Sequence, residues 1–149
     1  MSHRLMFMLA VLVGTGPVVA GIDEATELAQ KLQGEWEGVE IEIQGKKGSE
    51  ENAKAFRMSI KGDDVTVRTN SGPGRKSTLK LDPKKSPMEM DLTALERNEK
   101  GQTQHCIFSL DKDRLQLCAP IIGDKRPTEF KTKTKDGFVL VLLKRVEPK

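Results

Sequence analysis

From residue 35 to the end of the chain, apolar and polar residues alternate with a period of two over a series of short segments. Neighbouring side chains of a strand point to opposite faces of a sheet, so this alternation indicates strands with one buried face. It is clearest in the segments 56–60, 88–92 and 106–110. Turns rich in Gly, Asp and Pro separate the segments. The pattern therefore predicts a mostly β fold built from antiparallel neighbours.

Eight strands are expected, at 35–43, 56–61, 65–67, 78–81, 88–92, 105–110, 115–117 and 138–146. A short helix over 23–33 precedes them, with Asp23 as its N-cap and Gly34 at its C-terminal end. Short strands with one apolar face favour a closed or nearly closed barrel, because closure removes the exposed sheet edges. We predict an eight-stranded antiparallel barrel with a short N-terminal helix; a β-sandwich is the alternative.

The first and last of these strands carry irregular patterns. Val39, Ile41 and Ile43 share one face, whereas Trp36 has the opposite parity. A bulge at Gly38 would bring Trp36 and the later residues to the same side. The last strand is apolar on both faces over 138–143, so we expect cover on both sides, from the barrel interior and from an element such as the N-terminal helix.

The first 20 residues have the parts of a secretory signal peptide. Arg4 supplies a positive charge, an apolar run covers 5–13, and Val18-Val19-Ala20 forms a small-residue cleavage site. The run is shorter than the roughly 20 apolar residues of a membrane-spanning helix. We therefore expect an exported protein, periplasmic or extracellular, with a signal peptide at 1–20, one domain at 21–149 and no transmembrane segment after cleavage.

Charge and aromatic content argue against a nucleic-acid partner. Without residues 1–20 the chain has 24 basic and 22 acidic residues, so its formal charge is 24 − 22 = +2. The chain has one Trp and no Tyr, too few aromatics for a base-stacking surface. The basic stretches Arg75-Lys76, Lys84-Lys85 and 131–135 offer contact with an anionic envelope polymer, but solvated loops and faces are the favoured interpretation.

The residues that usually carry catalysis or bind metals are scarce. His105 is the single histidine after the signal peptide, and its neighbour Cys106 points to the opposite face of a strand. One His and two scattered Cys do not make a zinc site. We expect neither a catalytic centre nor a metal or cofactor.

The two cysteines, Cys106 and Cys118, raise the question of a disulfide in an exported protein. If Phe108 faces Leu117 across a hairpin, the two cysteines lie on opposite faces and cannot be bridged. A shifted register would permit the bridge but would turn the leucines out of the core. The unbridged state is favoured, and the register decides.

Gly34-Glu35-Trp36 resembles the Gly-x-Trp that opens the first strand of the lipocalin superfamily. In that family a basic residue near the end of the barrel packs over the tryptophan. Arg145, late in the last strand, is the matching residue. The resemblance implies a cation–π contact between Arg145 and Trp36 at the closed end of the barrel.

A longer resemblance begins at 32–36 and continues through 81–83, 86–92 and 113–118 to Arg126-Pro127-Thr128-Glu129-Phe130. It is to a domain family of unknown function that is abundant in planctomycete bacteria and often found on exported proteins. The resemblance implies export but no activity. In the segment 123–130, we expect Arg126 and Glu129 to cap backbone groups and fix a long crossover rather than to bind a ligand.

The leading functional hypothesis is a non-catalytic binding module with a small apolar ligand inside the barrel. The residues expected to line the ligand site are Phe56, Met58, Met90, Phe108 and Leu117. An alternative is an envelope interaction protein whose barrel is filled by its own side chains. A hydrolase is a remote third. The first two differ in whether the barrel contains a cavity.

Overall fold

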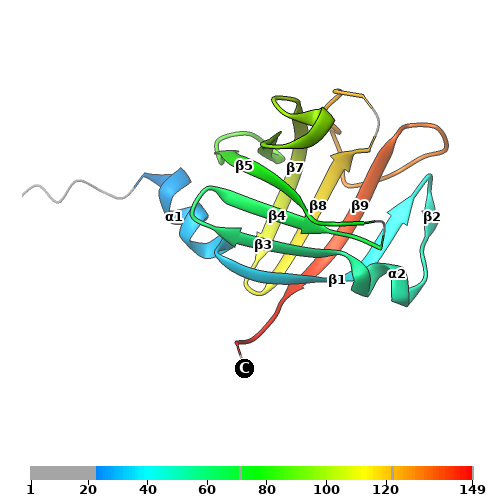
Figure 1. The fold of residues 1–149 in the computed structure, drawn as a ribbon, viewed down its shortest axis with the longest axis horizontal. Coiled ribbons are helices and arrows are strands. Elements are labelled where there is room, and N and C mark those ends of the chain that lie inside the picture. Colours follow the sequence, from blue (N-terminus) through cyan, green and yellow to red (C-terminus); the bar gives the residue numbers. More distant parts are fainter. Residues whose placement is uncertain (1–22, 71, 122, 149) are drawn as a thin grey trace, which may run out of the picture.

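The computed structural model describes residues 23–70, 72–121 and 123–148 (Figure 1). The predicted signal peptide at 1–20 lies outside these residues. The elements, in chain order, are α1 (Glu24–Leu32), β1 (Gly34–Ile43), β2 (Lys46–Lys47), α2 (Glu50–Ala55), β3 (Arg57–Lys61), β4 (Asp64–Arg68), β5 (Arg75–Asp82), β6 (Met88–Ala94), a 3₁₀ turn (Arg97–Glu99), β7 (Thr103–Asp111), β8 (Arg114–Pro120) and β9 (Phe138–Arg145).

The strands form one antiparallel sheet in the order β2-β1-β3-β4-β5-β6-β7-β8-β9. β1 also pairs with β9, from Trp36 opposite Arg145 to Ile43 opposite Val139. This pairing closes eight strands into a barrel, and the two residues of β2 extend the free edge of β1. The predicted eight-stranded barrel with its short N-terminal helix is confirmed, and the β-sandwich alternative is wrong.

One half of the barrel is filled by side chains. The large residues there are fully buried: Trp36, Met58, Ile60, Met90, Phe108, Leu115 and Leu143. Helix α1 adds Leu28 and Leu32 to the same core. The side chain of Gln33 ties the end of this helix to the β3–β4 turn through the backbone N–H and C=O of Gly62 (2.7 and 3.1 Å). Helix α1 therefore closes this end of the barrel.

β1 contains the expected irregularity, but its extra residue is Val39. Gly38 pairs with Leu143 and Glu40 with Leu142, so Val39 has no opposite residue and is 38% exposed. Beyond it, Ile41 pairs with the inward-facing Val141. The bulge thus returns Ile41 and Ile43 to the side of Trp36, as predicted. The expectation that Val39 shares that side is wrong, because the bulge itself takes up this residue.

Helix α2, which the alternation did not predict, lies where β1 separates from β3. The two strands pair only from Gly34 to Glu37, and the last contact is a bond from the Gly38 N–H to the Phe56 carbonyl (2.8 Å). A Cβ on Gly38 would lie 2.0 Å from the Ala53 carbonyl oxygen. The glycine is thus needed for this close approach of α2 to β1. The second half of β1 is then free of β3, and α2 lies beside the gap (Figure 1).

The long crossover between β8 and β9 runs over the outside of the barrel. Arg126 contacts the outer faces of β6 and β7, and the Lys131 backbone lies close to Cys118 on β8. Farther along, the buried Thr132 donates to Glu42 Oε1 (2.7 Å) and accepts from the Gly45 N–H (2.9 Å). Cys118, Leu140 and Glu42 form one row across β8, β9 and β1. The crossover therefore covers the outer apolar side of β9, and the expectation that α1 does so is wrong.

Cys106 and Cys118 are both buried and free. Phe108 pairs with Leu117 and Leu110 with Leu115, which is the register expected from the leucines. Cys106 consequently belongs to the barrel core, whereas Cys118 lies under the crossover. The favoured unbridged state is confirmed.

Candidate functional site

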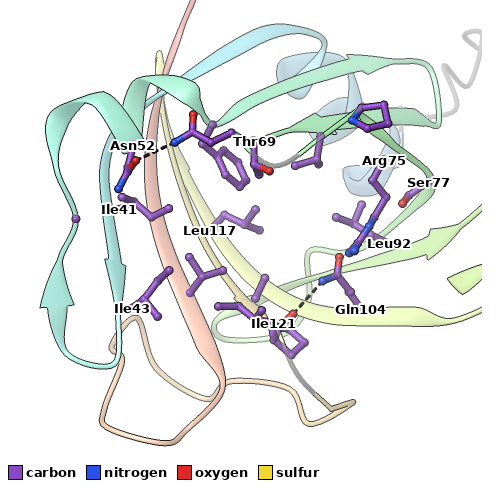
Figure 2. A pocket seen from close by; sticks show the side chains of 18 of the residues that line it. Ile41, Ile43, Asn52, Thr69, Arg75, Ser77, Leu92, Gln104, Leu117 and Ile121 are labelled. Atoms are coloured by element: carbon purple, nitrogen blue, oxygen red, sulfur yellow. Dashed lines mark hydrogen bonds between the residues drawn. The ribbon is translucent and has the colours of Figure 1, made fainter. Parts of the chain in front are cut away.

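The half of the barrel opposite α1 contains a cavity of about 600 Å³ (Figure 2). It lies at the strand ends farthest from α1, between Thr69 after β4, Arg75 at the start of β5, Gln104 in β7 and Pro120 at the end of β8. The gap beside α2 forms part of its side, through Asn52 and Phe56. The packed layer of the core forms its floor.

One wall of the cavity is apolar. β8 contributes Leu117 and Ala119, β9 contributes Val139, and β1 contributes Ile41 and Ile43. These residues share the inward parity of their strands, because Leu117 pairs with Val141 and Val141 with Ile41. The bulge at Val39 is what turns both isoleucines inward. This wall offers contact to an apolar group.

The facing wall, on β5, β6 and β7, is more polar. Arg75 and Ser77 have the same parity on β5 as the core residue Leu79, and Gln104 on β7 has the parity of Cys106 and Phe108. The Gln104 amide nitrogen donates to the Pro120 carbonyl (2.9 Å), which fixes the amide against the end of β8. Figure 2 shows the Arg75 side chain extending toward the Gln104 amide.

The rim is held by polar contacts between loops. Arg97, in the connection between β6 and β7, donates from Nη2 to the carbonyls of Pro73 (3.4 Å) and Gly74 (3.1 Å). The amides of Asn70 and Asn52 are hydrogen-bonded (2.8 Å), which joins the end of β4 to α2. Both contacts connect segments that no strand pairing holds together, so they define the mouth of the cavity.

The charged side chains in the described lining of the cavity are all positive. Its described lining includes three cationic side chains, Lys46, Arg75 and Arg97, and no carboxylate. A smaller recess of about 200 Å³ adjoins it between β5, β6 and β7 and shares Arg75, Ser77 and Gln104 with it. Glu99 is the carboxylate among the described residues of this recess. The mouth is therefore electropositive.

Of the five residues predicted to line a ligand site, Phe56 and Leu117 line this cavity. Met58, Met90 and Phe108 lie deeper, with no exposed surface, and fill the packed half. Parity correctly predicted that all three point inward but gave no information on their depth along the barrel axis. The polar wall of the cavity was not predicted from the sequence. Counting back by two from Leu79 gives Arg75 the inward parity, and its exposed side chain lies at the mouth of the cavity.

At the closed end, the predicted contact between Arg145 and Trp36 is present, with the guanidinium carbon 4.4 Å from the ring centroid. The same guanidinium donates to the carbonyls of Lys31 and Gln33 at the end of α1 and to Asp113 (3.0 Å) in the β7–β8 turn. The Trp36 indole N–H donates to the Leu32 carbonyl (2.9 Å). Arg145 and Trp36 thus join α1 to both strands of the barrel seam, which is a structural role.

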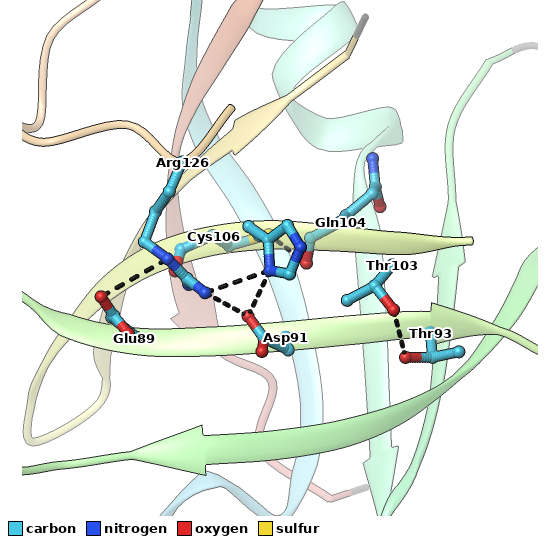
Figure 3. Close-up of polar contacts among 8 residues, drawn as sticks. Glu89, Asp91, Thr93, Thr103, Gln104, Cys106 and Arg126 are labelled. Carbon is cyan, nitrogen blue, oxygen red and sulfur yellow. Dashed lines mark hydrogen bonds and ion pairs between the residues drawn. The ribbon is translucent and has the colours of Figure 1, made fainter. Parts of the chain in front are cut away.

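Arg126 lies in a polar cluster on the outer face of the barrel (Figure 3). It donates to the Cys106 carbonyl (2.7 Å) and to Asp91 Oδ1 (2.7 Å), and its Nε lies 3.4 Å from Glu89. The prediction that Arg126 caps a backbone group and fixes the crossover is confirmed. The same prediction is wrong for Glu129, because its exposed carboxylate pairs with Lys133 of the same loop (3.6 Å) and so does not fix the loop to the barrel.

His105 belongs to the Arg126 cluster, with its Nδ1 atom 3.1 Å from both Asp91 Oδ1 and Arg126 Nη2. Cys106 points into the core, where burial raises the pKa of its thiol to about 12. The two side chains are therefore on opposite sides of β7 and do not form a nucleophile–base pair. Among the described residues, no group of three or more His, Cys, Asp or Glu is arranged to hold a metal ion.

These features define a closed eight-stranded antiparallel barrel with one packed end and one hollow end. In the part of the chain that the structure covers, none of the helices has the length and apolar character needed to cross a membrane. No family model, no curated protein and no solved structure matches this chain.

Proposed function

We propose that this chain is an exported, non-catalytic binding protein that holds a small, largely apolar molecule in the open half of its barrel. The cavity of about 600 Å³ is the observation that carries the proposal. Its size is within the roughly 300–1,000 Å³ that is typical of small-molecule sites, and such sites combine an apolar lining with a few polar groups. Export rests on the features of residues 1–20.

The size of the inward side chains explains why only one half of the barrel is hollow. The packed half contains Trp36, Met58, Met90 and Phe108, whose volumes fill the interior. Toward the mouth, the inward positions include Ser77, Ala94 and Ala119. Small side chains at these positions do not fill the interior of an eight-stranded barrel, so space remains. This favours ligand binding over an envelope protein with a filled barrel.

Native mass spectrometry of residues 21–149, purified after export, tests the proposal. We expect the folded protein to carry extra mass that denaturation removes, and the released compound identifies the ligand. A native mass equal to that of the bare chain, together with no binding of the neutral probe N-phenylnaphthylamine, would contradict a ligand-binding role. Binding partners would then be sought among envelope proteins or polymers.

A further inference from the structure

We infer that the ligand is an anionic amphiphile: a single apolar chain with a carboxylate or phosphate head group, which Arg75 binds. The inference rests on the proposed function, since it assigns the ligand class of that same cavity. The supporting observations are the position of Arg75, the sign of the charge at the mouth and the separation of polar and apolar walls.

Arg75 is the charged side chain of the polar wall, next to Ser77 and Gln104. No ion pair or hydrogen bond of its guanidinium is found among residues 23–70, 72–121 and 123–148. Arg126 and Arg145, in contrast, each donate to a carboxylate and to at least one backbone carbonyl. A guanidinium presents a planar set of donors that fits carboxylate and phosphate oxygens. Arg75 therefore offers an unused anion-binding group at the mouth of the cavity.

The surrounding charges reinforce this preference. Arg97 and Lys46 lie on the same mouth as Arg75, and the backbone carbonyls of Pro73 and Gly74 hold Arg97 in place. Glu99 is the opposing charge, and it lines the side recess rather than the main cavity. An anionic head group is attracted to this site, whereas a cationic one is repelled.

The apolar wall specifies the rest of the molecule. Leu117 and Phe56 are 3% and 9% exposed and lie deep in the cavity, whereas Ile43 is 42% exposed. A chain placed along these residues removes apolar surface from water on both partners. A wholly apolar ligand would cover Arg75 without pairing it, and leaving a charge unpaired on burial is costly. The two walls together fit a molecule with an anionic end and an apolar end.

A series of ligands that share one chain and differ only in the head group tests the inference. The compounds are dodecanoate, dodecyl phosphate, dodecanol and dodecyltrimethylammonium, titrated calorimetrically below their micelle-forming concentrations into the protein of residues 21–149. We expect at least one of the two anions to bind about tenfold more tightly than dodecanol, as a charge-assisted hydrogen bond allows. The cation should bind more weakly than dodecanol. The stronger of the two anions distinguishes a carboxylate from a phosphate head group.

A pair of variants tests whether Arg75 is the residue that binds the head group. Arg75→Gln should reduce the affinity for the preferred anion by about tenfold and leave dodecanol binding nearly unchanged. Lys76→Gln removes the same charge from the adjacent residue, which has the opposite, outward parity. It should change neither the affinity for the anion nor the affinity for dodecanol. Circular dichroism of both variants checks that the barrel is intact.

The possible outcomes distinguish the claim of an anionic head group from the claim of a binding cavity. Equal affinity for all four compounds, or equal effects of Arg75→Gln and Lys76→Gln, would overturn the anionic head group while leaving the binding cavity in place. Failure of all four compounds and of N-phenylnaphthylamine to bind would overturn both. Selective loss of anion binding in Arg75→Gln alone would support the inference.

Discussion

At the scale of single residues, the packing of Arg145 against Trp36 accounts for the identity of Gly34 as well. Gly34 has a φ of +119°, which residues with a side chain rarely adopt, and it allows the chain to pass directly from α1 into β1. A Cβ at this position would also lie 3.3 Å from Arg145 Nη1. Trp36 then lies beneath the guanidinium of Arg145. The Gly-x-Trp sequence is thus required by the geometry of the closed barrel end.

Replacing Arg145 should destabilise the fold. Arg145→Gln removes the contact with Trp36 and the charge-assisted bonds to Lys31, Gln33 and Asp113. We expect a loss of about 2 kcal/mol in the free energy of unfolding. Urea unfolding followed by the fluorescence of Trp36, the single tryptophan, measures it. Lys144→Gln is the matched control, because Lys144 is exposed on the outer face; an equal loss in both variants would contradict the assigned role.

Gly38 is the second residue whose identity is set by packing. Gly38→Ala places a Cβ against the Ala53 carbonyl, so either α2 or β1 must move. We expect a loss of about 3 kcal/mol in the free energy of unfolding, as for other overpacked sites. Val39→Ala changes the exposed neighbour and should cost less than about 0.5 kcal/mol. Denaturant titration compares them, and a stable Gly38→Ala variant would show that α2 does not need this close approach.

At the scale of elements, the crossover between β8 and β9 is attached at separate points. Arg126 binds it to β6 and β7, and Thr132 binds it to the β1–β2 turn. It buries Cys118, where burial raises the pKa of the thiol to about 11. The segment has no regular secondary structure over most of its length, so side-chain contacts replace a hydrogen-bonded ladder.

The Asp91 contacts predict a pH dependence of stability. Burial raises the pKa of Asp91, but the bonds and charges of Arg126 and His105 outweigh burial and lower it overall. Its unfolded-state pKa is near 4, so the ionised carboxylate stabilises the fold above that pH, and this stabilisation is lost as pH falls through the lower folded-state value. Glu89 is a further acidic neighbour in the cluster.

We therefore expect the stability difference between wild type and Asp91→Asn to be largest above about pH 5 and to shrink below about pH 4. Urea unfolding across this range measures the difference. Asp64→Asn, an exposed aspartate for which the structure gives no ion pair within the described residues, serves as the control. A difference that stays constant with pH would mean that Asp91 does not act through its charge.

At the scale of the whole molecule, the barrel combines a packed half that supplies stability with a hollow half that contains the cavity. Helix α1, Trp36 and Arg145 close the packed end, and the crossover covers one side of the barrel. The hollow half has several small inward side chains and is bounded partly by loops and α2 rather than by paired strands. The proposed binding cavity is therefore separate from the packed end that α1 closes.

Filling the cavity tests this separation. Ala119→Phe adds a ring at an inward position of the apolar wall. We expect it to abolish the binding of N-phenylnaphthylamine, measured by fluorescence, while changing the free energy of unfolding by less than about 1 kcal/mol, because the ring enters existing space. Lys80→Phe adds the same ring on the exposed outer face of β5 and should leave binding intact. Undiminished probe binding in Ala119→Phe would place the probe outside this cavity.

The amino-acid sequence by itself determined the eight strands, the register of the β7–β8 hairpin and the contact between Arg145 and Trp36. The strands and the register follow from local alternation, because neighbours along the chain decide which face a side chain takes. The contact is what the resemblance at Gly34-Glu35-Trp36 implies. Tertiary structure alone decided the depth of Met58, Met90 and Phe108, the place of α2, and the cover over β9. It also decided that Arg75 faces a cavity, because the space at the mouth depends on side chains from strands far apart in sequence. A period of two specifies a face, but only closure of the barrel specifies what lies across from it.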